Sequence, residues 1–185
     1  MERRKITARA KPPARTRPPA GKGAGGKKGG DPVRLAVAKA YLAFQRGGEF
    51  RDNPPVALRA EADRRLYVQL LRGMVRHRRL LESEIERFSG RPAAAQDATV
   101  ATLGLLGLFQ LRFLDRVPPH AAVHATVALA QAMGRSHAKG WINALLRNAQ
   151  RTEERAEGAA QPGLPLAVRT SHPDLLVQRW EGQLG

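Results

Sequence analysis

Few side chains in this sequence could carry out covalent chemistry, because the chain contains no cysteine. Without a thiol there is no disulfide, no cysteine metal ligand and no thiolate nucleophile, and a hydroxyl is a far weaker nucleophile near neutral pH. Ser171 and His172 are neighbours in the sequence, so their side chains point apart and do not form a pair of nucleophile and base. We expect Ser171 to cap the last helix instead.

Two histidines have the spacing of metal ligands on a helix. His120 and His124 are four residues apart, which would place both on one helical face. Ala121 stands where a metallopeptidase would carry its glutamate, and no second cluster of ligands accompanies the pair. The sequence therefore favours surface or packing histidines over a metal site.

The glycine-rich stretch 21–26 has the spacing of a dinucleotide-binding fingerprint, and with Lys27 it fits most of a phosphate-binding P-loop. Both motifs need a preceding strand and a following helix to aim backbone amides at phosphate. A P-loop also needs Ser or Thr where Lys28 stands. We interpret the stretch as a flexible basic linker and predict no cofactor for this chain.

Positive charge is the strongest chemical signal. The chain has a formal net charge of +16, and residues 1–30 hold ten bases against one acid. Because this segment has almost no large apolar side chains to bury, it is predicted to be a disordered basic arm. Cations without aromatic neighbours suit phosphate neutralisation, although a solubilising tail is the alternative. The candidate RNA-binding residues of the arm are Arg3, Arg4, Lys5, Arg9, Lys11, Arg15, Arg17, Lys22, Lys27 and Lys28.

A second basic cluster lies opposite the apolar face of a helical stretch predicted for residues 62–88. At 100° per residue its members fall on one side, and three glutamates of the stretch come only after them in the chain. Both an RNA contact and a solvated helix face fit such a cluster. Gly73 could break or kink the stretch, so it could be one helix or two. The arginines are Arg65, Arg72, Arg76 and Arg79.

Helical periodicity describes the rest of the chain. Asp31 and Pro32 predict the start of a first helix, and Asp97 predicts the cap of a helix that is apolar nearly all round and therefore central. A turn at Pro118 starts the next helix, and another follows from about Ala138. No stretch alternates with period two for long enough to predict a strand.

These elements predict an all-α chain in four parts. The parts are the arm at 1–30, a helical domain at 31–157, a linker at 158–170 and a short helix within 171–185. No apolar run resembles a signal peptide or reaches the roughly 20 residues that span a bilayer, which indicates a cytoplasmic protein without a membrane partner. Trp141 and Trp180 lie in apolar helical patterns, so we expect both to pack in a core or interface.

Five segments carry a resemblance to a known family, and they lie at 62–76, 103–111, 117–123, 140–148 and 171–180. The middle three read LGLLGLFQL, VPPHAAV and GWINALLRN. In order and spacing they resemble the NusB family, and in particular the NusB-like N-terminal domain of the RsmB family of small-subunit rRNA (cytosine-C5) methyltransferases. One departure is His124-Ala125, where the family commonly has Asn-Glu.

The resemblance implies a NusB-like helical bundle that binds RNA, above all rRNA, and that could also contact a protein partner. It carries RNA contact loosely onto Arg34 and Lys39 of the first helix. It further implies that S-adenosylmethionine and the nucleophilic cysteine belong to a catalytic domain that this sequence lacks, so we expect no catalytic residue here. The sequence is then a fragment of such an enzyme or a stand-alone relative.

The leading hypothesis is accordingly a non-enzymatic domain that positions rRNA for a methyltransferase. A transcription antitermination adaptor, which would recruit a protein partner to nascent RNA, is the alternative. A protein–protein domain whose basic tail binds nucleic acid without specificity also fits the charge pattern.

Overall fold

The computed structural model describes residues 30–156 and 163–184, and every regular element in these two stretches is helical. The predicted all-α class is therefore confirmed for the part of the chain that is described. No helix within it is both long and apolar enough to cross a membrane. The elements are α1 (Pro32–Gln45), α2 (Glu61–Arg76), α3 (Arg78–Ser89), η1 (Ala93–Ala95), α4 (Ala98–Phe113), α5 (Pro119–Ala132), η2 (Ser136–Ala138), α6 (Lys139–Ala156), α7 (Leu166–Thr170) and α8 (Asp174–Leu184).

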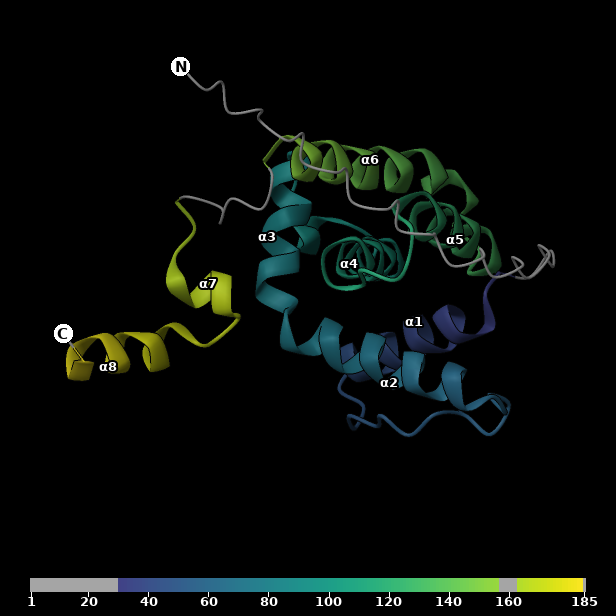
Figure 1. Cartoon of the computed structure of the whole chain (residues 1–185), viewed down its shortest axis with the longest axis horizontal. Coiled ribbons are helices and arrows are strands. Elements are labelled where there is room, and N and C mark those ends of the chain that lie inside the picture. The colour runs from purple at the N-terminus through teal and green to yellow at the C-terminus, as the bar shows by residue number, and fades with distance from the viewer. Residues whose placement is uncertain (1–29, 157–162, 185) are drawn as a thin grey trace, which may run out of the picture.

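Helix α4 forms the centre of the bundle, and Figure 1 views it nearly end-on with α1, α2, α3, α5 and α6 around it. Helices α1, α2, α3, α5 and α6 all pack against α4, and its residues 99–110 are buried without a break. Asp97 caps this helix as predicted, since its Oδ1 accepts from the backbone N–H of Thr99 at 3.0 Å and of Val100 at 3.2 Å. A helix that is apolar on every side is thus buried on every side.

Helix α1 begins where the sequence predicts. The Asp31 side chain accepts a hydrogen bond from the Arg34 backbone N–H at 3.0 Å, and Pro32 occupies the first helical position. Val37 and Tyr41 are fully buried on the inner face of the helix. After α1, the segment 46–60 leads across the molecule to α2.

The stretch predicted at 62–88 is two helices, and the break lies at His77 rather than at Gly73. The His77 ring stacks on Phe113 of α4 with a centroid distance of 4.2 Å. Gly73 lies within α2 for a different reason, because a Cβ there would come within 2.0 Å of the Phe109 ring. Gly73 therefore allows α2 to approach α4 closely and does not end the helix.

The C-terminal segment differs from the prediction in two ways. Residues 166–170, predicted as linker, form α7, which packs against α3 and buries Ala167. Ser171 does not cap the last helix, which begins at Asp174. Its Oγ instead accepts from the backbone N–H of Leu80 at 3.2 Å, so Ser171 satisfies a free amide in the first turn of α3.

The two tryptophans have different environments. Trp141 packs against the core cluster, as predicted. Trp180 is 42% exposed, and its ring makes an edge contact with His172 at a centroid distance of 5.4 Å. Helix α8 lies at the side of the bundle, next to α7 (Figure 1), so Trp180 does not pack in the core, and the predicted interface packing of Trp180 stays a prediction.

Candidate nucleic-acid interface

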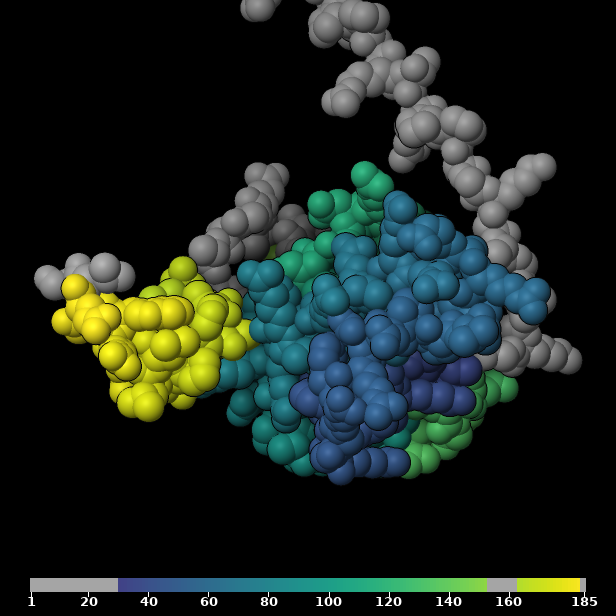
Figure 2. Space-filling model, turned by 90° about the horizontal axis from the view of Figure 1, so that it is seen from below, coloured from purple at the N-terminus to yellow at the C-terminus, as the bar shows by residue number. Residues whose placement is uncertain are grey.

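The outer face of α2 carries three of the four arginines predicted as a cluster. Tyr67, Leu70 and Met74 turn the opposite face of the helix into the core. Arg65, Arg72 and Arg76 consequently lie in solvent on one side of the helix. Figure 2 looks onto this side of the molecule, where the segment 46–60 and α2 form one continuous surface.

Two of these arginines have acidic neighbours that the sequence pattern did not reveal. Arg65 Nε donates to Glu61 Oε1 at 3.0 Å, and Arg72 Nε donates to Asp52 Oδ2 at 2.5 Å. Arg76 has no carboxylate partner within the described residues. Exposed pairs of this kind contribute only about 0–1 kcal/mol, so a phosphate could displace the carboxylates at little cost.

A shallow groove of about 570 Å³ lies along this face, between α2 and Pro54. Arg64 lines it together with Arg65 and Arg72. Arg64 was missed in the sequence because it falls outside the stripe defined by Arg65, Arg72 and Arg76. Arg64 belongs to the groove because the segment 46–60 lies beside it, and the helical periodicity of α2 contains no information about where that segment lies.

Arg79, the fourth predicted member, does not belong to this face. The break at His77 places it on α3, where its Nη2 donates to both carboxylate oxygens of Asp174 at 3.0 and 2.9 Å. Its Nη1 also donates to the His172 backbone carbonyl. Arg79 therefore ties the C-terminal segment to α3, and the prediction of one continuous stripe of four arginines is wrong.

Arg34 is buried rather than displayed. It is 8% exposed, its Nε donates to Gln110 Oε1 of α4 at 2.5 Å, and its Nη1 pairs with Asp31 at 2.8 Å. A guanidinium with these partners stabilises the contact of α1 with α4 and cannot reach a phosphate without leaving them. Lys39, the other α1 candidate, is exposed and lines a separate hollow of about 470 Å³ with Pro55 and Tyr67.

The ten candidate residues of the arm, from Arg3 to Lys28, lie outside the described residues. The described chain begins at Gly30, which lies against Leu129 of α5 at the start of α1. In Figure 1 the starts of α1 and α2 lie at the same end of the bundle. Gly30, where the described chain begins, therefore lies near the end of the bundle where the α2 groove begins.

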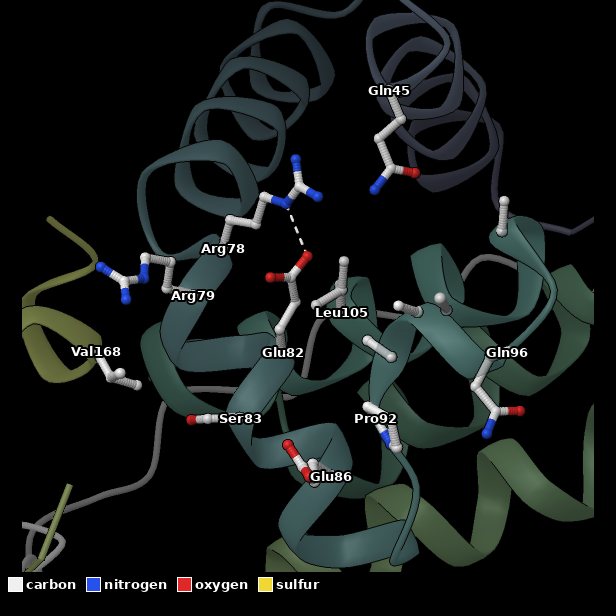
Figure 3. Close-up of a pocket in the computed structure, with 14 residues that line it drawn as sticks. Gln45, Arg78, Arg79, Glu82, Ser83, Glu86, Pro92, Gln96, Leu105 and Val168 are labelled. Carbon is white, nitrogen blue, oxygen red and sulfur yellow. Dashed lines mark hydrogen bonds and ion pairs between the residues drawn. The ribbon is translucent and has the colours of Figure 1, made fainter. Parts of the chain in front are cut away.

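A cleft of about 610 Å³ lies beside α3 (Figure 3). Arg78 and Gln45 point into it, and Arg78 Nε donates to Glu82 Oε1 at 2.7 Å, whereas Arg79 points away toward α7. Burial raises the pKa of Tyr41, beneath this pair, to about 12. The Ser83 hydroxyl in the cleft donates to the Leu80 carbonyl at 2.7 Å and is not aligned with a base.

The histidine pair shows no sign of a metal site. His120 and His124 are both exposed on α5, and no group of three or more potential metal ligands occurs among the described residues. The sequence preference for surface histidines agrees with this exposure. The glycine-rich stretch at 21–26 lies outside the described residues.

Comparison with known proteins identifies the family to which the chain belongs. The NusB family model matches residues 34–151. Curated proteins named ribosomal RNA small subunit methyltransferase B are similar to the chain. The one from Pseudomonas syringae is 39% identical over 145 residues, which is 76% of this chain and 31% of that protein. The probable enzyme from Synechocystis is 38% identical over 124 residues, 66% of this chain and 28% of that protein. The chain thus spans about three tenths of the length of the curated relatives it matches.

Proposed function

The chain belongs to the NusB family, and on that premise we propose that it binds RNA and positions small-subunit rRNA for a methyltransferase. Its relatives named for this activity share with it the NusB-like region. The observation that best supports RNA binding is the exposed face of α2, where Arg65, Arg72 and Arg76 recur over three helical turns beside a groove.

Binding in this proposal is mainly electrostatic. Each arginine that replaces the counterions of a phosphate gains free energy from counterion release, and structured RNA is recognised mostly by shape and by its backbone. The face of α2 is held rigid because its inner residues are buried against the bundle. The ten basic residues of the arm would add phosphate contacts to those of α2.

We assign methyl transfer itself to a separate domain. The chain has no cysteine to supply the thiolate that the family resemblance implies. Its described residues form no β-sheet edge, where nucleotide-like cofactors bind in α/β domains. S-adenosylmethionine would therefore be bound by a methyltransferase domain that acts together with this one.

A salt titration of RNA binding tests the proposal. The full chain is mixed with a fluorescently labelled hairpin from small-subunit rRNA, and binding is followed by anisotropy between about 50 and 200 mM NaCl. If the arm and α2 together make six to ten phosphate contacts, affinity should fall by about 10³- to 10⁵-fold over this range. Affinity that stays constant over the range would overturn electrostatic docking.

Paired variants locate the contacts. Arg72→Gln/Arg76→Gln should reduce the slope of log K against log salt by about 1.4–1.8, which corresponds to two lost phosphates. Arg169→Gln/Arg179→Gln removes the same charge from exposed positions on α7 and α8 and should leave the slope near its original value. Equal effects of the two pairs would show that only net charge matters and would contradict a specific face.

A further inference from the structure

A second positively charged hollow lies where the end of α3 meets α6. This cleft of about 330 Å³ is lined by Arg87 and Phe88 from α3 and by Asn148, Arg151 and Thr152 from α6. Figure 1 shows the far end of α3 running up to α6, on the opposite side of the bundle from α2. None of these residues was a candidate in the sequence.

The two arginines of the cleft are held in place by uncharged groups. Arg151 Nη2 donates to Asn148 Oδ1 at 2.6 Å, and its Nε donates to the Arg147 carbonyl at 3.4 Å. Asn148 is itself fixed, because its Nδ2 donates to the Phe88 carbonyl at 3.3 Å at the end of α3. The Arg87 guanidinium lies 5.2 Å from the centre of the Phe88 ring.

This arrangement differs from that of the arginines that form ion pairs. Eight arginines of the described residues, Arg65 and Arg72 of the α2 face among them, form ion pairs with aspartate or glutamate, and each carboxylate offsets part of the positive charge beside it. Arg87 and Arg151 have no carboxylate partner within the described residues. Uncharged acceptors orient a guanidinium without neutralising it, so its charge and outer N–H groups stay available for an anion.

We propose that this cleft binds a phosphodiester group of RNA, as a contact separate from the α2 face. The inference rests on the proposed RNA-binding function and adds a second site to it. The planar, forked donors of two arginines match the geometry of phosphate oxygens, and Thr152 adds a hydroxyl to the cleft wall. Asn148 positions Arg151 and is not itself required to touch the ligand.

The position of the cleft sets a length for the RNA. Helix α3 has 12 residues, and a rise of about 1.5 Å per residue gives it a length of about 18 Å. An RNA that contacts both α2 and the cleft would follow a path of about this length, which equals about five stacked nucleotides at about 3.4 Å each.

Substitution of the cleft arginines in the full chain tests the inference with the same labelled hairpin. Arg87→Gln/Arg151→Gln should reduce the salt slope by about 1.4–1.8, which removes about 7- to 12-fold of the affinity change between 50 and 200 mM NaCl. Arg87→Lys/Arg151→Lys keeps the charge and should retain most of the slope. Arg169→Gln/Arg179→Gln is again the control for charge alone.

A purely structural role of the two arginines is the competing explanation, because cations near helix C-termini stabilise the helix dipole. Urea denaturation of each variant measures that role directly. If Arg87→Gln/Arg151→Gln lowers stability but leaves the salt slope unchanged while Arg72→Gln/Arg76→Gln reduces it, the cleft is not an RNA site and the proposed function stands. If the unmodified chain shows no salt dependence, the proposed function fails first.

Discussion

Replacing Arg34 separates a structural arginine from an RNA-binding one. In Arg34→Met the side chain keeps its apolar length, so no large cavity forms, but Gln110 Oε1 loses its donor. Gln110 is fully buried, and its Nε2 is already engaged with the Leu106 carbonyl and Thr126 Oγ1 at 3.1 and 3.2 Å. The amide therefore cannot rotate to satisfy its oxygen without losing these bonds.

The expected loss of stability follows from these contacts. An unsatisfied buried acceptor costs about 1–3 kcal/mol. The ion pair with Asp31 adds at most about 1 kcal/mol, because the Asp31 side chain is 34% exposed. We expect Arg34→Met to lower the free energy of unfolding by about 2–3 kcal/mol, which moves the urea midpoint down by about 1 M.

Urea denaturation and the RNA salt titration should be run on the same variant. Lys39→Met is the control, since Lys39 lies on the same helix and is exposed, and its replacement should change stability by less than about 0.5 kcal/mol. Arg34→Met should leave the salt slope unchanged. Unchanged stability together with a slope reduced by about 0.7–0.9 would refute the structural role and return Arg34 to the RNA interface.

Two further substitutions test the packing and the charge of the bundle. Gly73→Ala would gain up to about 1 kcal/mol of helix propensity in an open position, but its Cβ would meet the Phe109 ring. We therefore expect the free energy of unfolding, measured by urea denaturation, to fall by about 1–3 kcal/mol and to be partly recovered by adding Phe109→Leu. A gain in stability would contradict the close contact. The hydrogen bond from Arg135, with those from the α4 backbone, lowers the pKa of Asp97 from 3.8 to about 2. The stabilisation of the fold by the ionised Asp97 carboxylate should therefore be complete above about pH 4 and be lost as the pH falls toward 2. Asp97→Asn should flatten this part of a plot of urea midpoint against pH.

Features set by local sequence were predicted correctly. The caps at Asp31 and Asp97 depend on residues two or three positions away, so they could be read from the chain directly. The burial of α4 follows from a helix with no polar side. The basic face of α2 at Arg65 and Arg72 follows from helical periodicity, because it needs only the direction of the apolar face.

Features set by distant contacts were not predictable in this way. Arg34 is buried because Gln110 lies 76 positions away in the chain. Ser171 caps α3 across 91 positions, and no local pattern connects it with Leu80. Sequence spacing can show that a residue is basic, but whether its charge is free depends on what the rest of the chain brings beside it.

The partners of an arginine, together with its position in a basic pattern, determine how easily it could bind a phosphate. Arg79 fits the pattern but is held by Asp174, whereas Arg151 was outside every pattern and is supported by Asn148, which carries no charge. An arginine paired with a buried or well-placed acid must lose that acid before it can bind phosphate, and one oriented by neutral groups pays no such cost. In this chain the break at His77 directs α3 away from the α2 face and toward α6. The arginines that follow α2 therefore meet either an acid, as Arg79 does, or the neutral groups at the α6 cleft, as Arg87 does.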